Sequence, residues 1–257
     1  MKITALLENI SACGLPVEHG LSLFVETDAC RFLFDMGQTD LFARNAVALG
    51  IDLNTADFAV LSHGHYDHGG GLSTFLKLND HAPVYMSCHA FEPHYNGTEK
   101  YIGLEPSLQA SGRIVYVDEK KEIAPGLTLY NRPDAVKVMD FGSCGLNVVQ
   151  DGVMQPEDFR HEQYLLAEEN GKRILFSGCS HRGILNIMRW FEPDILIGGF
   201  HLSKLPLDET LASYVDQLNA YQTVYYTCHC TGVEQFRFMQ GRMEHLRYIS
   251  AGDSVVI

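Results

Sequence analysis

The stretch LSHGHYDHGGGL, residues 61–72, places three histidines and an aspartate within six positions and follows them with three glycines. It overlaps the end of DFAVLSH (57–63), an apolar run that is too short for a helix and rich in strand formers, so we expect a buried strand there. The chain has 12 histidines in 257 residues, and solvated loop histidines do not explain three of them at the end of one strand. The fold must therefore bring several nitrogen and oxygen ligands together at this strand end.

Side chains alternate along an extended chain, so His63 and His65 project to the same side and can bind one ion. If the backbone then curls, Asp67 and His68 face a second position nearby. The glycines 69–71 would permit the curl, because glycine tolerates positive φ and lets the backbone come close to a ligand. Neutral imidazoles with a carboxylate suit zinc, iron or manganese and leave coordination positions open, which favours a catalytic site.

The segment His63-Gly64-His65-Tyr66-Asp67-His68 is similar to the H-x-H-x-D-H signature of the metallo-β-lactamase superfamily. RFLFDMG (31–37) resembles the strand of that family that ends in Asp-x-Gly. The segments HEQYLL, LFSGCSHRGI, GGFHL and HCTG resemble a subgroup of synthases for dihydropterin and ribofuranosylaminobenzene phosphate, and together these segments extend over nearly the whole chain. The resemblance implies an α/β fold, an αββα four-layer sandwich with metal ligands on loops along one edge of the packed sheets.

The resemblance also implies the remaining ligands. His161 in FRHEQYLL, Cys179 in LFSGCSH and His229 in YYTCHCTG take the places of the family's later motifs. Two divalent cations are then expected, zinc in the first place and iron or manganese as alternatives. The implied sets are His63, His65 and His161 for one ion, and Asp67, His68, Cys179 and His229 for the other. Cys179 stands where the family more often has a bridging Asp. How the second ion is held is therefore an open question.

Asp67 and His181 are the expected catalytic residues. A hydroxide shared by two cations would be the nucleophile, because each cation lowers the pKa of the water between them. Asp67 would orient this hydroxide, and His181, two residues after Cys179, would protonate the leaving group, ligate a metal or support a ligand. Asp35 resembles the family's aspartate that accepts an imidazole N–H, and the alternative is a turn aspartate before Gly37.

Three further residues are candidates for substrate binding. Arg182, and Thr231 at the start of a helix, could anchor a phosphate, the latter through backbone N–H groups. The alternatives are a solvated charge and a simple helix cap. His201 ends the apolar run DILIGGFH (194–201). It could face the site or be a buried structural histidine, and the sequence does not decide between these two roles. Cys228 and Cys230 flank His229 and are expected to point away from it into the packing.

Strand and helix patterns alternate along residues 1–257, which we expect to form a single domain of two similar halves, with two sheets inside and helices outside. Predicted strands lie at 2–8, 21–27, 31–37, 57–63, 82–88, 113–119, 126–132, 146–152, 194–201 and 223–229. A hairpin over 163–181 has its turn at Asn170-Gly171. Predicted helices lie at 41–50, 72–78, 184–191, 208–221 and 233–241. Residues 90–113 show no clear periodicity and are expected to form a loop that covers the substrate or a surface excursion.

The formal net charge of −13 argues against a broad nucleic-acid surface. The seven cysteines are an odd number and widely spaced, as in a reducing cytoplasm. The start MKITALLENISACG lacks the basic and long apolar regions of a signal peptide, and no apolar run is long enough to span a membrane. We therefore expect a cytoplasmic protein with a small-molecule substrate and without a nucleic-acid or membrane partner, of unknown oligomeric state.

The function that these features predict is a dinuclear metal-dependent hydrolase acting on a small anionic ester such as a phosphoester. One alternative is a pterin-pathway synthase that displaces diphosphate. The other is a non-hydrolytic iron-binding redox or sensor protein, in which Cys179 and histidines hold iron. A fold of this kind does not by itself decide between these reactions.

Overall fold

The computed structural model describes residues 1–131 and 136–257, so Arg132, the last residue of the strand predicted at 126–132, lies outside the described residues. Within the described residues, the strands form three sheets. The first sheet has the order β18 (Ser254–Val256), β1 (Lys2–Leu7), β2 (Ser22–Glu26), β3 (Arg31–Phe34), β4 (Phe58–Val60), β5 (Val84–Ser87) and β8 (Ile114–Val117). The second has the order β17 (Leu246–Tyr248), β16 (Val224–Thr227), β15 (Ile195–Gly198), β14 (Lys172–Ser177), β13 (Gln163–Glu169), β10 (Leu127–Asn131) and β9 (Lys120–Ala124). The third has the order β12 (Val153–Pro156), β11 (Leu146–Gln150), β6 (His94–Asn96) and β7 (Lys100–Tyr101).

The first two sheets repeat one plan. In each, the earlier strands pair antiparallel, and the later strands pair parallel: β3 to β8 in the first sheet and β14 to β17 in the second. The carboxyl ends of parallel strands meet at one edge of a sheet, and loops at such an edge form ligand sites in α/β proteins. The two similar halves expected from the sequence are therefore present. That they form one domain stays a prediction.

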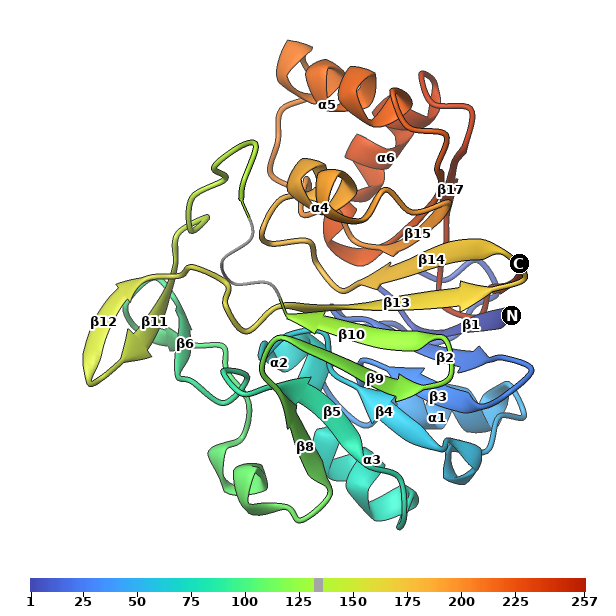
Figure 1. Ribbon diagram of the computed structural model, residues 1–257, viewed down its shortest axis with the longest axis vertical. Helices are drawn as coiled ribbons and strands as arrows, with labels where there is room; N and C mark the ends of the chain where they lie inside the picture. The colour runs from blue at the N-terminus through green and yellow to red at the C-terminus, as the bar shows by residue number, and fades with distance from the viewer. Residues whose placement is uncertain (132–135) are drawn as a thin grey trace.

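Figure 1 shows the layers: the two sheets lie face to face, and the helices cover their outer sides. The helices are α1 (Leu41–Ala48), α2 (Tyr66–Gly69), α3 (Leu72–Leu78), α4 (Ile184–Phe191), α5 (Glu209–Asn219) and α6 (Val233–Gln240). Short 3-10 helices lie at Leu53–Thr55, Pro106–Ala110 and His229–Thr231. Phe32 and Phe34 of the first sheet pack with Leu165 and Phe176 of the second in a core shared by both sheets. The predicted αββα sandwich is confirmed.

Local sequence explains why these elements form where they do. Asn170 (φ 53°) and Gly171 (φ 73°) both adopt positive φ, and Glu169 pairs with Lys172 across the turn. This is the two-residue turn whose twist matches a β-hairpin. The helix α4 agrees with the predicted range. Its aliphatic residues and Phe191 are buried, Trp190 is half-buried and Arg189 faces solvent, as helical periodicity requires.

The third sheet was not predicted. Figure 1 shows it projecting from the layered body beside the edge where β13 begins and α2 lies. Its strands β6 and β7 fall in the region 90–113 without periodicity, and each has only a few residues, too few to show an alternating pattern. The functional consequence is that a small sheet flanks the strand ends at which the histidine motif lies.

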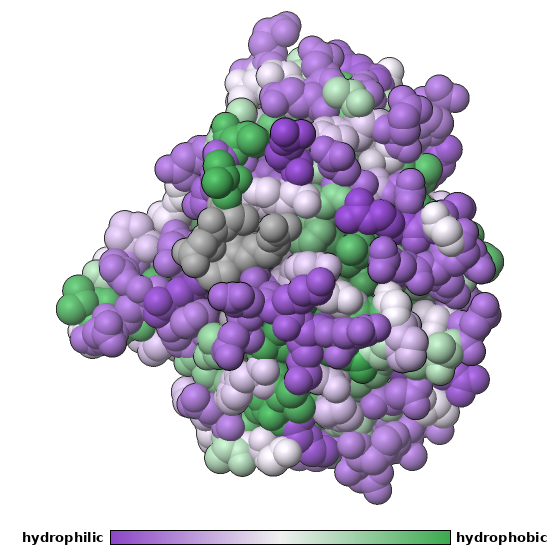
Figure 2. Space-filling model, in the orientation of Figure 1, coloured by the Kyte–Doolittle hydropathy of each residue, from purple (hydrophilic) through white to green (hydrophobic). Residues whose placement is uncertain are grey.

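The outer surface is mainly polar on the face seen in Figure 2, where hydrophobic side chains gather in small separate patches among hydrophilic ones. None of the helices in the described parts of the chain has both the length and the apolar character of a membrane span.

Candidate metal centre

The histidine motif occupies the loop after β4 and the single-turn helix α2. A Cβ on Gly64 would lie 2.0 Å from the Ala90 carbonyl oxygen, and one on Gly71 would lie 2.2 Å from the Met36 carbonyl oxygen. Gly70 and Gly71 have φ of −61° and −76°, so the expectation of positive φ in the glycine run is wrong. These glycines are needed because neighbouring backbone approaches closely, and this packing holds α2 against the loop after β3.

Asp35 is the hydrogen-bonding centre beneath the motif. Its carboxylate is fully buried and accepts three hydrogen bonds of 2.7 Å, from the Ser62 N–H, the Ser62 hydroxyl and the His68 Nδ1–H. Since the Ser62 hydroxyl donates to Asp35, its oxygen accepts from His63 Nδ1 at 2.8 Å. One carboxylate thus fixes the proton on Nδ1 of both His63 and His68, leaving each Nε2 with a free lone pair.

Asp35 itself has φ of 60°, and Ser180, His201 and His229 share this left-handed conformation. Residues other than glycine rarely adopt positive φ, and such strain concentrates at functional sites because the surrounding structure must enforce it. These four residues all lie at or beside predicted site residues.

His68, Cys179, Asp67 and His229 come together from three distant parts of the chain. His68 Nε2 lies 3.1 Å from Cys179 Sγ and 4.0 Å from Asp67 Oδ2, and His229 Nε2 lies 3.4 Å from the same Asp67 oxygen. His229 Nδ1 lies 2.8 Å from Asn9 Oδ1, an oxygen that also accepts from the Gly20 N–H. The Nδ1 of His229 is therefore the protonated nitrogen, and its Nε2 is available to a cation.

The remaining imidazoles gather around His63. The ring centroid of His63 lies 4.7 Å from that of His65, 4.9 Å from that of His181 and 5.8 Å from that of His161. His65 and His181 are also 4.9 Å apart. All four rings are buried, so the structure brings together the first-ion residues expected from the sequence and adds His181 to them.

Most of these nitrogens have no hydrogen-bond partner among the described residues. This holds for the Nε2 atoms of His63, His65, His161 and His229, and for both nitrogens of His181. An unpaired polar atom in the interior costs free energy, and several unpaired nitrogens of one kind in one place need an explanation. Divalent cations provide one, because imidazole lone pairs are their usual ligands.

The charges of the site agree with cation binding. Burial, and then the neighbouring His68, holds the pKa of His63 well below its usual range, and burial lowers the pKa of His229 to about 4. These rings are therefore neutral at pH 7. Burial alone would raise the pKa of Asp67, but the neighbouring imidazoles of His19 and His229 outweigh it and hold the pKa well below its usual range. Burial, and then Cys230, raises the pKa of the Cys179 thiol, and a bound cation would oppose this by favouring the thiolate.

A cavity of about 340 Å³ opens at this cluster. It is the place where a substrate can reach the cluster, because the cavity is of the size that small-molecule sites have. Five histidines, one carboxylate, two thiols and two lysines lie on its wall. The lining residues are His19, His65, Tyr66, Asp67, Asn96, Lys100, Ile102, Leu146, Cys179, His181, His201, Ser203, Lys204, His229 and Cys230.

The candidates for substrate binding meet different outcomes. His201 lines the cavity, and its ring lies 4.3 Å from that of His181. Arg182 is buried, with its guanidinium over the Trp190 ring, and it does not belong to the described residues that line the cavity. Thr231 is also buried, where its hydroxyl accepts from the Phe200 N–H. The structure therefore uses Arg182 and Thr231 in packing and places neither at the cavity.

Cys228 lies in the core between the sheets, as expected. Cys230 is also buried but lines the cavity, and its thiol approaches the Cys179 carbonyl oxygen at 3.4 Å. The expectation that Cys230 points away from the site is therefore wrong, because the chain turns into a 3-10 helix at His229 and strand alternation ends there.

Sequence reasoning missed three residues near the site. His94 and Glu157 are buried and bonded to each other at 2.7 Å, beside His161. His19, which is partly exposed, approaches Asp67 Oδ2 at 3.2 Å. His94 lies in a region without periodicity and His19 between loop residues, so neither position carries a local signal. The spacing of Glu157 and His161 was the one available hint.

The comparisons with known proteins agree with this geometry. Residues 15–221 match the model of the metallo-β-lactamase superfamily, and the chain belongs to this family. The resemblance seen in the motifs is thereby confirmed.

Three similar proteins extend the match to almost the whole chain. An uncharacterised protein of Methanocaldococcus jannaschii is 29% identical over 242 residues, 90% of each chain. The 7,8-dihydropterin-6-methyl-4-(β-D-ribofuranosyl)-aminobenzene-5'-phosphate synthase of the same organism is 26% identical over 280 aligned positions, covering 98% of this chain and 95% of the synthase. The crystal structure of Tm1679, described as a metal-dependent hydrolase of the β-lactamase superfamily, superposes with a TM-score of 0.86 at 29% identity and covers 100% of this chain and 99% of its own.

Proposed function

We propose that this protein is a metal-dependent hydrolase with two divalent cations that acts on a small anionic ester. The observation that carries the proposal is the set of buried imidazole nitrogens without hydrogen-bond partners, which faces or adjoins a cavity. The similarity to Tm1679, a metal-dependent hydrolase by its description, supports the same class of reaction.

Two groups of side chains would hold the cations. Asp67, His68, Cys179 and His229 form one, and His63 and His65 with a further imidazole form the other. Cys179 can serve both groups, since its Sγ belongs to a ligand set with His68 and His229 and to another with His63 and His181. Zinc suits this mixture of imidazole, thiolate and carboxylate best. Divalent cations there would supply Lewis-acid activation of water and of the ester.

The chain's own residues would place the reactants. The Asp67 carboxylate remains ionised at neutral pH, so it can accept a hydrogen bond from the attacking water and hold that water in line. Asp67 is itself held by His19 and His229. Asp67 is buried, and the lower dielectric of a buried position strengthens each of these interactions.

The substrate class follows from the charges at the cavity. Lys100 comes from β7 in the third sheet, and Lys204 comes from the segment after β15. Both line the cavity. The Lys100 ammonium lies over the Tyr66 ring at 5.6 Å. In a chain with a net charge of −13, two lysines at the cavity favour a phosphoester or carboxylate substrate, and they take the role that the sequence suggested for Arg182 and Thr231.

A screen of the purified enzyme tests the proposal. Metal-stripped protein is reconstituted with zinc, manganese or iron and assayed with phosphomonoesters, phosphodiesters, thioesters and lactones. We expect hydrolysis of at least one anionic ester that depends on added metal and is lost in the Asp67→Ala variant. A protein that retains no tightly bound ion, or whose activity survives in Asp67→Ala, would contradict the proposal.

A second candidate is a synthase reaction, which the similarity to the Methanocaldococcus synthase favours because it extends over 98% of this chain. In that reaction, the same cations and lysines would bind a phosphorylated substrate. Incubation with the two substrates of that synthase distinguishes the candidates. Product formation without ester hydrolysis would favour the synthase.

A further inference from the structure

His161 differs from the other histidines of the centre in the state of its ring. Its Nδ1 accepts the Gly64 N–H at 2.8 Å. A nitrogen that accepts an N–H carries no proton, so the neutral ring of His161 has its proton on Nε2. The Nε2 of His63 and of His229 carries a lone pair instead, because there Nδ1 bears the proton. An Nε2–H cannot ligate a cation.

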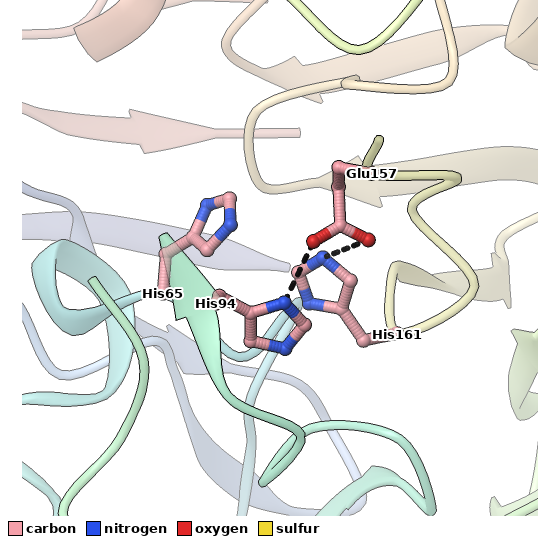
Figure 3. Close-up of side chains that lie close together, drawn as sticks. All are labelled: His65, His94, Glu157 and His161. Carbon is pink, nitrogen blue, oxygen red and sulfur yellow. Dashed lines mark hydrogen bonds and ion pairs between the residues drawn. The ribbon is translucent and has the colours of Figure 1, made fainter. Parts of the chain in front are cut away.

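The surroundings of His161 suit a donor. Its Nε2 lies 3.7 Å from Glu157 Oε1, and the other oxygen of Glu157 accepts from His94 Nδ1 at 2.7 Å. Figure 3 shows the Glu157 carboxylate above the two rings, with a dashed line to each, while His65 has none. The rings of His94 and His161 are stacked at 4.0 Å. Glu157 thus accepts a hydrogen bond from His94, and its other oxygen lies near the Nε2 of His161, where a protonated nitrogen is favoured over a lone pair.

His181 differs from His161, whose Nδ1 is hydrogen-bonded and whose Nε2 alone lacks a hydrogen-bond partner among the described residues. Neither nitrogen of His181 has a hydrogen-bond partner among the described residues, and the side chain is buried. Its ring lies 4.9 Å from each of His63 and His65, and a ligand atom of His181 falls in one set with His63 and Cys179. His181 also lines the cavity, whereas His161 does not belong to the described residues that do so.

The segment of His181 is firmly held. The buried carboxylate of Glu162 accepts from the His181 N–H at 2.7 Å and from the Arg182 N–H at 3.1 Å. Phe159 stacks on the imidazole with a centroid distance of 4.6 Å and an interplanar angle of 12°. The ring is therefore presented to His63 and His65 in a fixed orientation, which is what a ligand requires.

We infer that His181, and not His161, completes the set that holds the first cation, together with His63 and His65. His161 then lies with Glu157 and His94 in a group outside the ligand sets that binds no ion. A ligand role also removes His181 as the proton donor to the leaving group. The inference rests on the proposed metal centre and changes the residues assigned to it.

The test replaces each histidine by asparagine and measures bound metal. Asparagine places an oxygen near the position of Nδ1, so His161→Asn keeps an acceptor for the Gly64 N–H and removes the Nε2 nitrogen. Zinc content is measured after dialysis, and the affinity by chelator competition. We expect wild type and His161→Asn to hold two ions with affinities within a few-fold of each other. We expect His181→Asn to retain one ion after dialysis. Its affinity for the first ion should fall by more than the roughly 10- to 100-fold that loss of a supporting residue costs.

X-ray absorption of the zinc-loaded variants gives a readout that does not depend on activity. The mean number of imidazoles per zinc should fall in His181→Asn reloaded with two equivalents and stay unchanged in His161→Asn. Loss of an ion in His161→Asn with retention in His181→Asn would overturn the inference while leaving the metal centre itself in place. Wild type without bound zinc would overturn both.

Glu157→Gln serves as the third arm, because the ligand atoms of His65, His94, Glu157 and His161 also lie within 4.8 Å of one another. If this group held a cation, Glu157→Gln would lose one ion and the wild type could bind a third. Unchanged metal content in Glu157→Gln is the result that our assignment predicts. Far-ultraviolet circular dichroism of each variant excludes misfolding as the cause of a loss.

Discussion

Replacing Asp35 by asparagine should weaken the metal centre without changing its shape. The carboxylate accepts three hydrogen bonds, one at Oδ1 from the Ser62 N–H and two at Oδ2 from the Ser62 hydroxyl and the His68 Nδ1–H. An amide has one oxygen, so in either orientation its NH₂ group faces a donor. With the oxygen toward the Ser62 N–H, the NH₂ group faces His68 Nδ1, and the ring relieves the conflict by moving its proton to Nε2.

The magnitude follows from these bonds. A buried donor left without a partner costs about 1–3 kcal/mol, and loss of the residue that orients a metal-bound histidine lowers metal affinity roughly 10- to 100-fold. These estimates agree, since each factor of ten corresponds to about 1.4 kcal/mol. Moving the proton of His68 to Nε2 removes the lone pair that faces Cys179, so the loss should fall on the cation held by Asp67, His68, Cys179 and His229.

The assay is chelator competition with zinc on wild type, Asp35→Asn and the control Asp57→Asn. Asp57 also accepts a backbone N–H, that of Arg31 at 2.8 Å, but it is exposed and its hydrogen-bond partner is not a residue of the metal centre. We expect one of two zinc affinities to fall about 10- to 100-fold in Asp35→Asn and neither to change in Asp57→Asn. Wild-type affinity for both ions in Asp35→Asn would refute the reasoning.

Three further outcomes are expected. Replacing Lys100 and Lys204 each by glutamine should raise KM for a phosphoester about five-fold, because an exposed charge contributes at most about 1 kcal/mol. KM for a neutral ester should stay unchanged, and Lys121→Gln, on β9, is the control. Removing the cations should lower the melting temperature, since zinc at 100 times its dissociation constant adds about 2.7 kcal/mol to stability, and a melting curve unaffected by chelator would contradict this. The metal-free protein should lose stability as the pH falls from 6.5 toward 4. Burial lowers the pKa of His229 and that of His201 from 6.5 to about 4 in the folded state, so the unfolded chain binds these protons first. Constant stability over this range would count against neutral buried imidazoles.

The sequence was sufficient to predict the layered fold, because the elements that build it carry strong local patterns. The run at β4 is buried on both faces, the residues of α4 recur at helical spacing, and Asn170-Gly171 determines the hairpin turn. The small third sheet could not be found in this way. Its strands β6 and β7 have three and two residues. They depend on pairing with each other and on the pairing of β6 with the distant strand β11 rather than on their own periodicity.

The candidate site, like the fold, could be predicted from the sequence only in part. The contiguous motif and the strand ends showed which residues converge, and the structure brings together His63, His65, Asp67 and His68 with the distant Cys179 and His229. The ring protonation states could not be read from the sequence. They depend on long-range partners such as Gly64 for His161 and Asn9 for His229.

The same limit explains the anion-binding candidates. Arg182 was a reasonable candidate by its position after His181, but whether an arginine faces a cavity or packs on a tryptophan depends on its neighbours in space. Lys100 and Lys204 reach the cavity from segments that are 104 positions apart, with no motif at either. Their role emerges only when the third sheet lies beside the centre.

A crystal structure of the zinc-loaded protein with anomalous data at the zinc edge tests the central claim most directly. The account predicts two anomalous peaks, one contacted by His63, His65 and His181 and the other by Asp67, His68, Cys179 and His229. An absence of peaks at the cavity after zinc loading would contradict the metal centre, and a first peak bound by His161 in place of His181 would contradict the assignment of its ligands.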